Sequence, residues 1–427
     1  MTAGAALAGG VFLLLLLAGF WIPFAVAVGA LLMLWEYGGW NAFRAIGFVS
    51  WGSLNSFTLT AIPLFLLMAE ILLRSGVGAR AYRGLGRVTG RLPGGLLQTN
   101  IAGCALFAAI NGSSVATAAT IGTVALPEMR SRGYDARMAA GSIAAGGTLG
   151  ILIPPSIAMI VYATFTETSV SQLFAAGILP GLLMTGLFMA FIALRAIRRP
   201  ETAPAAEPDG RGLGGMVGDL LPFVLLIGVV LGSIYGGVAT PTEAAAMGVV
   251  GAFALALLFG RSDAAVIGEA LAATVRTTAS VLFIVLAAAL LSYCLGVTGT
   301  GRGLTEWVVG LGLSRLAFLL TVVALYVVLG CIIDSLAMIV ITVPMLHPVL
   351  LAYGVDPVWF GVLLVILIEM GQITPPFGIN LFVIQGIGGG RFEEVAAGSA
   401  PYVVLMGAMI ALLLAFPALA LWLPGVL

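Results

Sequence analysis

Long apolar runs recur along most of this sequence. Seven of them are continuous and long enough to cross a bilayer as one helix, since a span needs about 17–25 residues. They occupy residues 11–35, 57–73, 173–194, 220–237, 244–260, 277–297 and 401–424. A segment that enters lipid must satisfy its backbone polar groups internally, and an α-helix does so. The pattern therefore predicts an all-α, polytopic membrane protein.

Four further apolar regions are interrupted near their centres. Residues 95–127 and 316–346 are too long for one helix, and small or polar residues divide each of them, so we expect two helical hairpins. Residues 138–163 and 358–386 each contain a Pro-Pro pair within an otherwise apolar span. Because proline removes an amide donor and clashes with the preceding turn, these two regions are predicted to be broken helices.

Arginines in the connections indicate the orientation of the chain. They form three clusters, at 74–91, 130–137 and 195–211. The positive-inside rule places all three connections in the cytoplasm. The hairpin 95–127 then starts and ends on one side, which predicts a re-entrant hairpin or a pair of short spans. No arginine lies between Arg315 and Arg391, so we expect the connection after 316–346 to be periplasmic.

The two Pro-Pro pairs belong to an internal repeat. Pro154-Pro155 and Pro375-Pro376 are 221 residues apart, and sliding residues 112–180 by that offset aligns twelve identities without a gap. Seven of the twelve are glycine or proline, the residues that fix backbone shape. In the first copy the identities are Ser114, Ala116, Pro127, Gly133, Asp135, Gly150, Pro154, Pro155, Ala175, Ala176, Gly177 and Pro180.

The two copies are expected to face opposite sides of the membrane. The connection 128–137 falls inside and its counterpart 349–358 outside, which makes the repeats inverted, a build typical of secondary transporters. We therefore divide the chain into three parts: a first repeat at 1–194, a cytoplasmic linker at 195–219 and a second repeat at 220–427. Asp135 and Asp356 follow Gly-x in these connections, where helix capping or a turn is the expected role.

Composition narrows the classes of function. Of the 427 residues 61% are hydrophobic and only 8% are charged, where a soluble domain has about 25%. The net charge is zero, which gives no argument for a nucleic-acid partner.

The first run, 11–35, has no preceding arginine and no cleavage pattern after it, so we expect a retained helix and not a signal peptide. A membrane enzyme such as a serine protease needs a histidine base, and His347 is the only histidine, so we expect no enzyme.

The broken helices carry the expected chemistry. Each Pro-Pro pair frees backbone carbonyl groups inside the bilayer, where an ion, a substrate, water or protein must satisfy them. Freed carbonyl oxygens suit Na⁺, and the N-terminus of the next half-helix suits an anion.

The first hairpin tip reads Asn111-Gly112-Ser113-Ser114-Val115-Ala116-Thr117, and the second, Asp334-Ser335, corresponds to Ser113-Ser114. Asp334 and Glu369 are ionisable groups in apolar runs and hence functional candidates. One Pro-Pro pair alone would more simply be a kink, but two symmetric pairs favour a site.

Several motifs resemble a known family. In the first half they are Ala61-Ile62-Pro63, Leu92-Pro93-Gly94-Gly95, the first hairpin tip, Gly133-Tyr134, Ile153-Pro154-Pro155-Ser156-Ile157 and Leu173-Phe174-Ala175-Ala176-Gly177-Ile178-Leu179-Pro180-Gly181. In the second half they are Thr240-Pro241-Thr242-Glu243-Ala244-Ala245-Ala246, Asp334-Ser335, Phe360-Gly361 and Ile373-Thr374-Pro375-Pro376-Phe377-Gly378-Ile379-Asn380. Together they resemble the large permease subunit of tripartite ATP-independent periplasmic (TRAP) transporters.

This resemblance implies an elevator-type carrier of the ion-transporter superfamily in the bacterial inner membrane. Such a carrier uses a Na⁺ gradient, with two or more Na⁺ sites expected, to import small organic anions, here carboxylates. The implied partners are a periplasmic solute-binding protein and a small four-helix membrane subunit, expected to be separate because no such block precedes residue 11.

In this family the hairpin tips and the broken helices hold Na⁺ and substrate. Carried over to this sequence, the implied Na⁺ site comprises Gly112, Ser114, Thr117, Pro154, Asp334, Thr374, Pro375 and Gly378. The implied substrate-binding residues are Asn111, Ser113, Ser156, Ser335 and Asn380. Asn111 departs from the Ser expected in many members, which bears on the first Na⁺ shell or the substrate fit.

Other functions stay open at this point. A stand-alone carboxylate carrier of the same superfamily, coupled to Na⁺ or H⁺, would need no partner subunits. A proton-driven carrier would use Asp334 or Glu369. A purely structural membrane scaffold leaves the paired broken helices unexplained.

Overall fold

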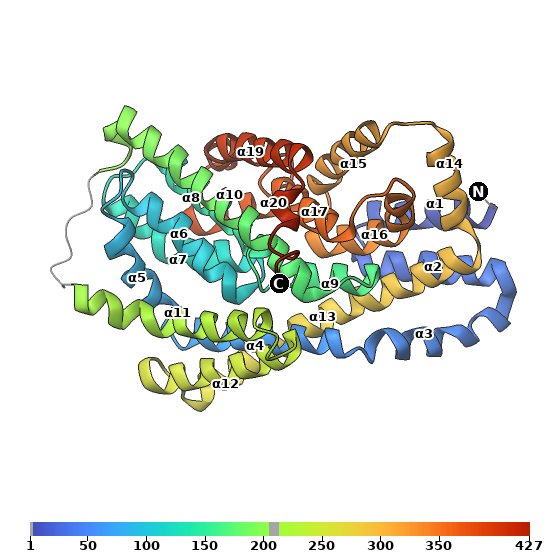
Figure 1. Cartoon of the computed structure of the whole chain (residues 1–427), viewed down its shortest axis with the longest axis horizontal. Helices are drawn as coiled ribbons and strands as arrows, with labels where there is room; N and C mark the ends of the chain where they lie inside the picture. Colours follow the sequence, from blue (N-terminus) through green and yellow to red (C-terminus); the bar gives the residue numbers. More distant parts are fainter. Residues whose placement is uncertain (1–2, 205–212) are drawn as a thin grey trace.

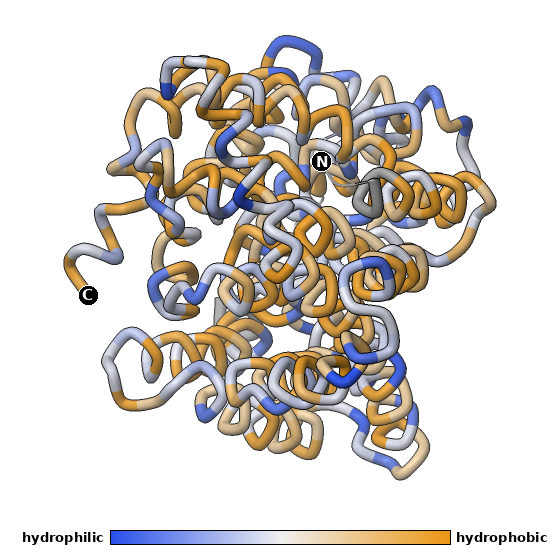
Figure 2. The backbone as a smooth tube through the Cα atoms, turned by 90° about the vertical axis from the view of Figure 1, so that its right-hand side faces the viewer, coloured by the Kyte–Doolittle hydropathy of each residue, from blue (hydrophilic) through white to orange (hydrophobic). Residues whose placement is uncertain are grey.

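The computed structural model describes residues 3–204 and 213–427 (Figure 1). This described part contains helices and no strand, and nine of its helical stretches are long and apolar enough to cross a membrane. Large apolar side chains are exposed on its surface, among them Val250, Leu258 and Val404. Figure 2 shows hydrophobic residues along peripheral helices as well as interior ones. Since lipid accepts such a surface and water does not, the prediction of an all-α membrane protein is confirmed.

One group of helices lies mainly along the lower and right-hand sides of Figure 1. It comprises α1 (Ala3–Leu17), α2 (Ile22–Ala42), α3 (Arg44–Leu54), α4 (Phe57–Arg74), α5 (Val77–Thr89), α11 (Leu213–Tyr235), α12 (Pro241–Phe259), α13 (Ala264–Val297) and α14 (Thr300–Gly310). Within it α4 packs on α12 and α13, and α11 packs on α5 and α12. We call this set the outer group.

The second set holds all four interrupted regions, and we call it the inner group. It comprises α6 (Leu96–Asn111), α7 (Ser114–Ser131), α8 (Ala136–Leu152), α9 (Ile157–Thr166), α10 (Val170–Arg198), the 3-10 helix η1 (Pro200–Thr202), α15 (Arg315–Gly330), α16 (Ser335–Ala352), α17 (Pro357–Gln372), α18 (Ile379–Gly388), α19 (Phe392–Ala415) and α20 (Ala418–Leu421). Here α8 packs on α6, α7 and α19, while α17 packs on α15.

All four predicted interruptions are present. The hairpin 95–127 is α6 and α7 with a turn at Gly112, and 316–346 is α15 and α16. The broken helix 138–163 is α8 and α9, and 358–386 is α17 and α18. Both Pro-Pro pairs lie in the breaks, since proline cannot donate the helical hydrogen bond.

The repeat also shows in how these helices begin. Asp135 caps α8 by accepting a hydrogen bond from the Met138 amide at 2.8 Å, and Asp356 caps α17 by accepting from the Trp359 amide at 2.9 Å. The predicted capping role of both aspartates is therefore confirmed. The two residues correspond at the repeat offset of 221 residues, so equivalent helices start with equivalent caps.

Four boundaries differ from the predictions. The run 11–35 is not one helix, because a turn at Gly19, with a positive φ of 79°, separates α1 from α2. The run 401–424 is likewise divided, because α19 ends at Ala415 just before Pro417. The arginine-rich connection after residue 74 contains the helix α5, and both α10 and α11 extend into the predicted linker 195–219. Apolarity alone gave no signal for turns inside apolar runs or for a polar helix.

Candidate functional site

The first hairpin tip sits directly against the first helix break. Gly112 follows the last residue of α6 as its C-cap, with a φ of +58°, a conformation that favours glycine. A Cβ atom at position 112 would lie 2.8 Å from the carbonyl oxygen of Pro155. Glycine is therefore required here by space as well as by φ. Because glycine has no side chain, the backbone of the hairpin tip can lie directly against the backbone carbonyl groups of the break.

Two glycines that correspond in the repeat make the same kind of approach. A Cβ atom on Gly150 of α8 would lie 2.6 Å from the Ser113 carbonyl oxygen and 2.9 Å from the Thr117 hydroxyl oxygen. One on Gly371 of α17 would lie 2.5 Å from the Cα of Gly330, at the end of α15. Each broken helix thus lies against one hairpin, with no room for a side chain between them.

The second broken helix reaches back to the first hairpin. The side-chain nitrogen of Asn380, in α18, donates a hydrogen bond to the Ser114 hydroxyl at 2.7 Å and a longer one to the Ala144 carbonyl at 3.4 Å. Asn380 is fully buried and Ser114 is 2% exposed. The two residues were predicted for substrate and Na⁺ respectively, and the fold brings them into contact.

Several buried oxygen atoms around these elements have no hydrogen-bond partner within the described residues. They are Thr117 Oγ1, Asn380 Oδ1, Glu369 Oε2 and Gln372 Oε1. An unsatisfied buried polar atom costs about 1–3 kcal/mol, so a native site leaves such atoms open for a reason. All four are oxygens, which are the ligands that hard cations accept.

Glu369 joins the two broken helices. Its Oε1 accepts a hydrogen bond from the Ile151 amide at 3.3 Å, near the end of α8, while the residue itself belongs to α17. The side chain is fully buried. Gln372, three residues further along α17, is 2% exposed and was not identified from the sequence. An amide side chain one turn from a carboxylate in an apolar helix was the available signal.

Most other predicted site residues serve local structure. Ser113, Ser156 and Asp334 are the N-caps of α7, α9 and α16, and each accepts a hydrogen bond from an amide of the first turn. Thr374 donates its hydroxyl hydrogen to the Met370 carbonyl at 2.6 Å, which leaves its oxygen lone pairs available. Asn111 ends α6, Ser335 begins α16, and Gly378 precedes α18 with a φ of +34°.

The two breaks differ in exposure. Pro154 is buried, whereas Pro375 and Pro376 are exposed in this chain. The hydrogen bonds of Asp334 and Thr374 stay within their own segments. The first tip and its surroundings are therefore assembled more completely than the second. No group of three or more His, Cys, Asp or Glu side chains converges within residues 3–204 and 213–427. Of the four oxygens without partners in this described part, only that of Glu369 belongs to a carboxylate.

Comparison with known proteins identifies the family. The model of the tripartite ATP-independent periplasmic transporter, DctM component, matches residues 10–419. This chain belongs to that family. It is 35% identical over 390 residues to the C4-dicarboxylate TRAP transporter large permease protein DctM of Rhodobacter capsulatus, covering 88% of each chain. It is 32% identical to the isethionate TRAP transporter permease protein DctMQ of Oleidesulfovibrio alaskensis, covering 97% of this chain and 66% of that one.

Solved transporters share the fold of this TRAP component. The YdaH transporter of Alcanivorax borkumensis superposes with a TM-score of 0.65 at 16% identity, over 90% of this chain and 89% of that one. With nine candidate spans among its described residues, this TRAP component is a multi-pass protein of the bacterial inner membrane. Its family is one of transporters and not of enzymes, as the sequence predicted.

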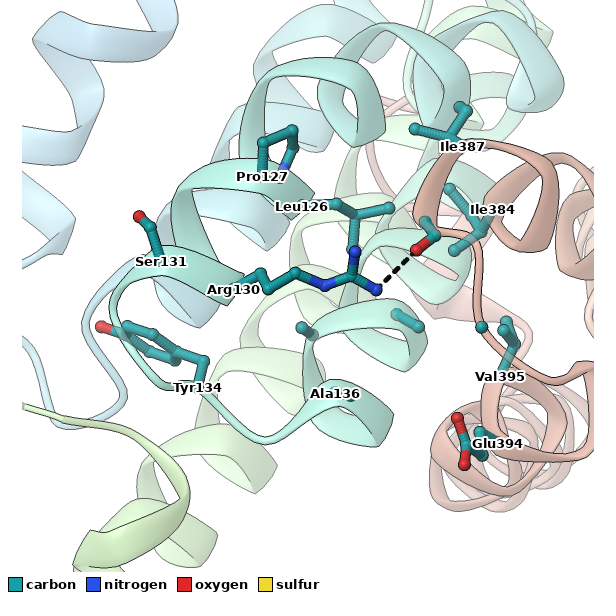
Figure 3. A pocket seen from close by; sticks show the side chains of 14 residues that line it. Leu126, Pro127, Arg130, Ser131, Tyr134, Ala136, Ile384, Ile387, Glu394 and Val395 are labelled. Carbon is teal, nitrogen blue, oxygen red and sulfur yellow. Dashed lines mark hydrogen bonds between the residues drawn. The ribbon is translucent and has the colours of Figure 1, made fainter.

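A cavity in the described part of this TRAP component lies away from the oxygen atoms described above. It has a volume of about 420 Å³ and opens between the end of α7, the start of α8 and the connection from α18 to α19. Figure 3 shows Arg130 extending toward the end of α18, where it donates a hydrogen bond to the Gly388 carbonyl at 2.9 Å. None of the predicted Na⁺ or substrate residues lines it.

Proposed function

We propose that this TRAP permease component imports small organic anions by Na⁺ coupling. The observation that carries the proposal is a set of buried oxygens, at Thr117, Asn380, Glu369 and Gln372, that have no hydrogen-bond partner among the described residues. A cation bound to such an oxygen would satisfy an acceptor that otherwise costs free energy. Hydroxyl, amide and carbonyl oxygens are hard ligands, which an alkali cation prefers, and the residues predicted at the two hairpin tips offer no soft ligand such as sulfur.

The first Na⁺ would lie where the first hairpin tip meets the first break. Ser114 uses one acceptor site for the Asn380 amide, and a hydroxyl oxygen has two lone pairs, so a second stays available. Thr117, one turn along α7, adds a hydroxyl oxygen that has no partner in the part of the chain that the structure describes. The backbone at Gly112 and Pro154 supplies carbonyl groups beside them.

A second Na⁺ would use the corresponding elements of the second repeat. Thr374 keeps its oxygen lone pairs, and the backbone of Pro375 and Gly378 contributes carbonyl groups. Asp334 supports this site from the second tip while it caps α16. Because Pro375 is exposed, the second break is packed less completely than the first, and ion binding would order its backbone more.

The substrate anion would lie between the two hairpin tips. Half-helices α9 and α18 begin at the breaks, and helix N-termini present amides and a positive dipole to an anion. Asn111, Ser113, Ser156, Ser335 and Asn380 would supply hydrogen bonds. The relatives from Rhodobacter and Oleidesulfovibrio are named for C4-dicarboxylates and for isethionate, and both substrates are small organic anions.

Partners and movement complete the proposal. We expect a small four-helix membrane subunit and a periplasmic binding protein, and the longer Oleidesulfovibrio relative carries a combined DctMQ name in support of the former. The inner group, with both hairpins re-entrant and both breaks at the substrate, would move as an elevator against the outer group. The inverted repeats 1–194 and 220–427 would let the substrate site open in turn to the periplasm and to the cytoplasm.

Reconstitution tests this proposal. The chain and its small subunit are reconstituted in proteoliposomes, and the binding protein encoded by a neighbouring gene is added outside. Uptake of labelled C4-dicarboxylate is then followed. We expect uptake to require an inward Na⁺ gradient and the binding protein. Equal uptake on a proton gradient without Na⁺ would overturn Na⁺ coupling, and uptake without the binding protein would favour a stand-alone carrier.

A further inference from the structure

A second cavity lies where α8, α10 and α19 come together, at the upper left of Figure 1. It has a volume of about 320 Å³, and we call it the arginine pocket. The side chains that matter for its chemistry are Asp135, Arg137, Arg195, Arg199 and Tyr402. A shallower groove of about 230 Å³ adjoins it, and the two share Phe191, Arg195 and Arg199.

Charge in the arginine pocket is unbalanced. Three arginines and one aspartate, Asp135, line the pocket, and the Asp135 carboxylate already caps α8 through the Met138 amide. Within the described residues, none of Arg137, Arg195 and Arg199 forms an ion pair. Like charges gathered at one place repel, so their convergence indicates an anion that is held between them.

Two buried polar atoms in the pocket also lack partners. Arg195 Nε is buried without an acceptor, and the hydroxyl of Tyr402, a residue 1% exposed, has no hydrogen-bond partner within the described chain. The Tyr402 ring is held by edge contacts with Phe188 and Phe191, at centroid distances of 5.1 and 5.3 Å. A guanidinium can only donate, so the missing partner of Arg195 must be an acceptor.

The surroundings favour a phospholipid as the source of that acceptor. Arg195 and Arg199 lie at the end of the candidate span Val170–Arg198, where a helix leaves the bilayer. On the same helix Leu194 is 49% and Ile197 65% exposed, and Leu194 also lines the adjoining groove. Apolar surface beside clustered guanidinium groups suits an acyl chain below a phosphate.

We propose that the arginine pocket binds the phosphate of an anionic phospholipid, at the membrane face that carries the arginine-rich connections. Arg195 and Tyr402 donate hydrogen bonds to its oxygens, while Arg137 and Arg199 supply charge. The lipid would fasten the start of α8 to α10 and α19, and the other end of α8 is the first helix break. The site is independent of the proposed Na⁺ and substrate residues.

Ligand titrations test the proposal. The purified chain, delipidated in non-ionic detergent, is titrated with dihexanoyl phosphatidylglycerol, dihexanoyl phosphatidylcholine or inorganic phosphate while its unfolding temperature is recorded. We expect saturable stabilisation by phosphatidylglycerol and much less by phosphatidylcholine. Arg195→Gln should weaken the apparent affinity about tenfold, since a charge-assisted hydrogen bond is lost. Tyr402→Phe, which keeps both the fold and the charge, should weaken it a few-fold.

Arg83→Gln is the matched control. Arg83 is an exposed residue of α5 in another arginine cluster, so this variant removes the same charge outside the pocket. It should bind phosphatidylglycerol as the unmodified chain does. Stabilisation by inorganic phosphate alone, lost in Arg195→Gln and Tyr402→Phe, would support the pocket and assign it to a soluble phosphate. The proposal would be overturned if neither phosphatidylglycerol nor inorganic phosphate stabilised the chain. It would also be overturned if Arg83→Gln lost as much affinity as Arg195→Gln.

Discussion

The side-chain nitrogen of Asn380 donates a hydrogen bond to the hydroxyl oxygen of Ser114 at 2.7 Å, although the two residues are 266 positions apart in the sequence. The bond joins the half-helix after the second break to the first hairpin, and so crosses between the two repeats. The bond uses one N–H of the amide, while Asn380 Oδ1 has no partner in the described part of the chain. The orientation of that oxygen toward a ligand therefore depends on Ser114.

Ser114→Ala should impair both stability and ion coupling. The substitution leaves a buried amide N–H unpaired, which costs about 1–3 kcal/mol, and it removes a predicted Na⁺ ligand. We expect a lower unfolding free energy and a higher Na⁺ concentration for half-maximal uptake. Thr123→Ala in the same helix is the control, because the exposed Thr123 hydroxyl bonds only to the Thr120 carbonyl. Equal effects of the two variants would contradict the role of Ser114.

The repeat-matched glycines should be intolerant of a single methyl group. Gly150→Ala and Gly371→Ala each force a Cβ into the backbone of a hairpin, and overpacking of this kind costs about 1–3 kcal/mol. We expect both variants to lose transport, measured at matched expression. Gly186→Ala in α10 meets nothing within 4 Å and should transport normally. Normal transport by Gly150→Ala would show that the first hairpin is not held closely to α8.

Glu369→Gln separates Na⁺ coupling from proton coupling. Glutamine keeps the shape and the acceptor that pairs with the Ile151 amide, but it cannot carry a proton. Under Na⁺ coupling the variant should still take up substrate in a Na⁺-dependent way, but at a higher Na⁺ concentration, because an amide nitrogen replaces the free Oε2. Glu369→Ala, which removes the acceptor as well, should be destabilised. A folded Glu369→Gln protein without uptake, together with proton-driven uptake by the unmodified chain, would make Glu369 the proton carrier.

The inverted topology can be tested by labelling. Cysteines are introduced in place of the exposed residues Ser131 and Ala352, which lie at the two corresponding connections. Two native cysteines are buried and Cys331 is partly exposed, so Cys331→Ser provides the background. A membrane-impermeant reagent applied from the periplasm should label Ala352→Cys and spare Ser131→Cys. Labelling of both positions from one side would contradict inversion.

Local chemistry explains what the sequence predicted well. Pro154-Pro155 and Pro375-Pro376 break their helices because proline acts on its own turn, whatever surrounds it. The same holds for the caps at Asp135 and Asp356, whose side chains bond amides three residues away. Such signals need no knowledge of the tertiary structure.

Contacts between distant segments were not predictable in this way. The bond between Asn380 and Ser114 joins residues that the repeat does not align, since Ser114 corresponds to Ser335. The arginine pocket draws Arg137, Arg195 and Tyr402 from three helices. The turn at Gly19 lies inside an unbroken apolar run, where hydrophobicity gives the same signal for one helix or two.

The account rests on Na⁺ binding at the first hairpin tip, and equilibrium binding of radioactive Na⁺ to the purified chain tests this most directly. The key variant is Thr117→Val. It removes, at nearly constant volume, a buried hydroxyl that has no partner within residues 3–204 and 213–427, so folding should be unaffected. Thr123→Val, at an exposed position of the same helix, is the control. We predict saturable Na⁺ binding by the unmodified chain and by Thr123→Val, and clearly weaker binding by Thr117→Val. Absence of saturable Na⁺ binding, or identical binding by Thr117→Val, would contradict the account.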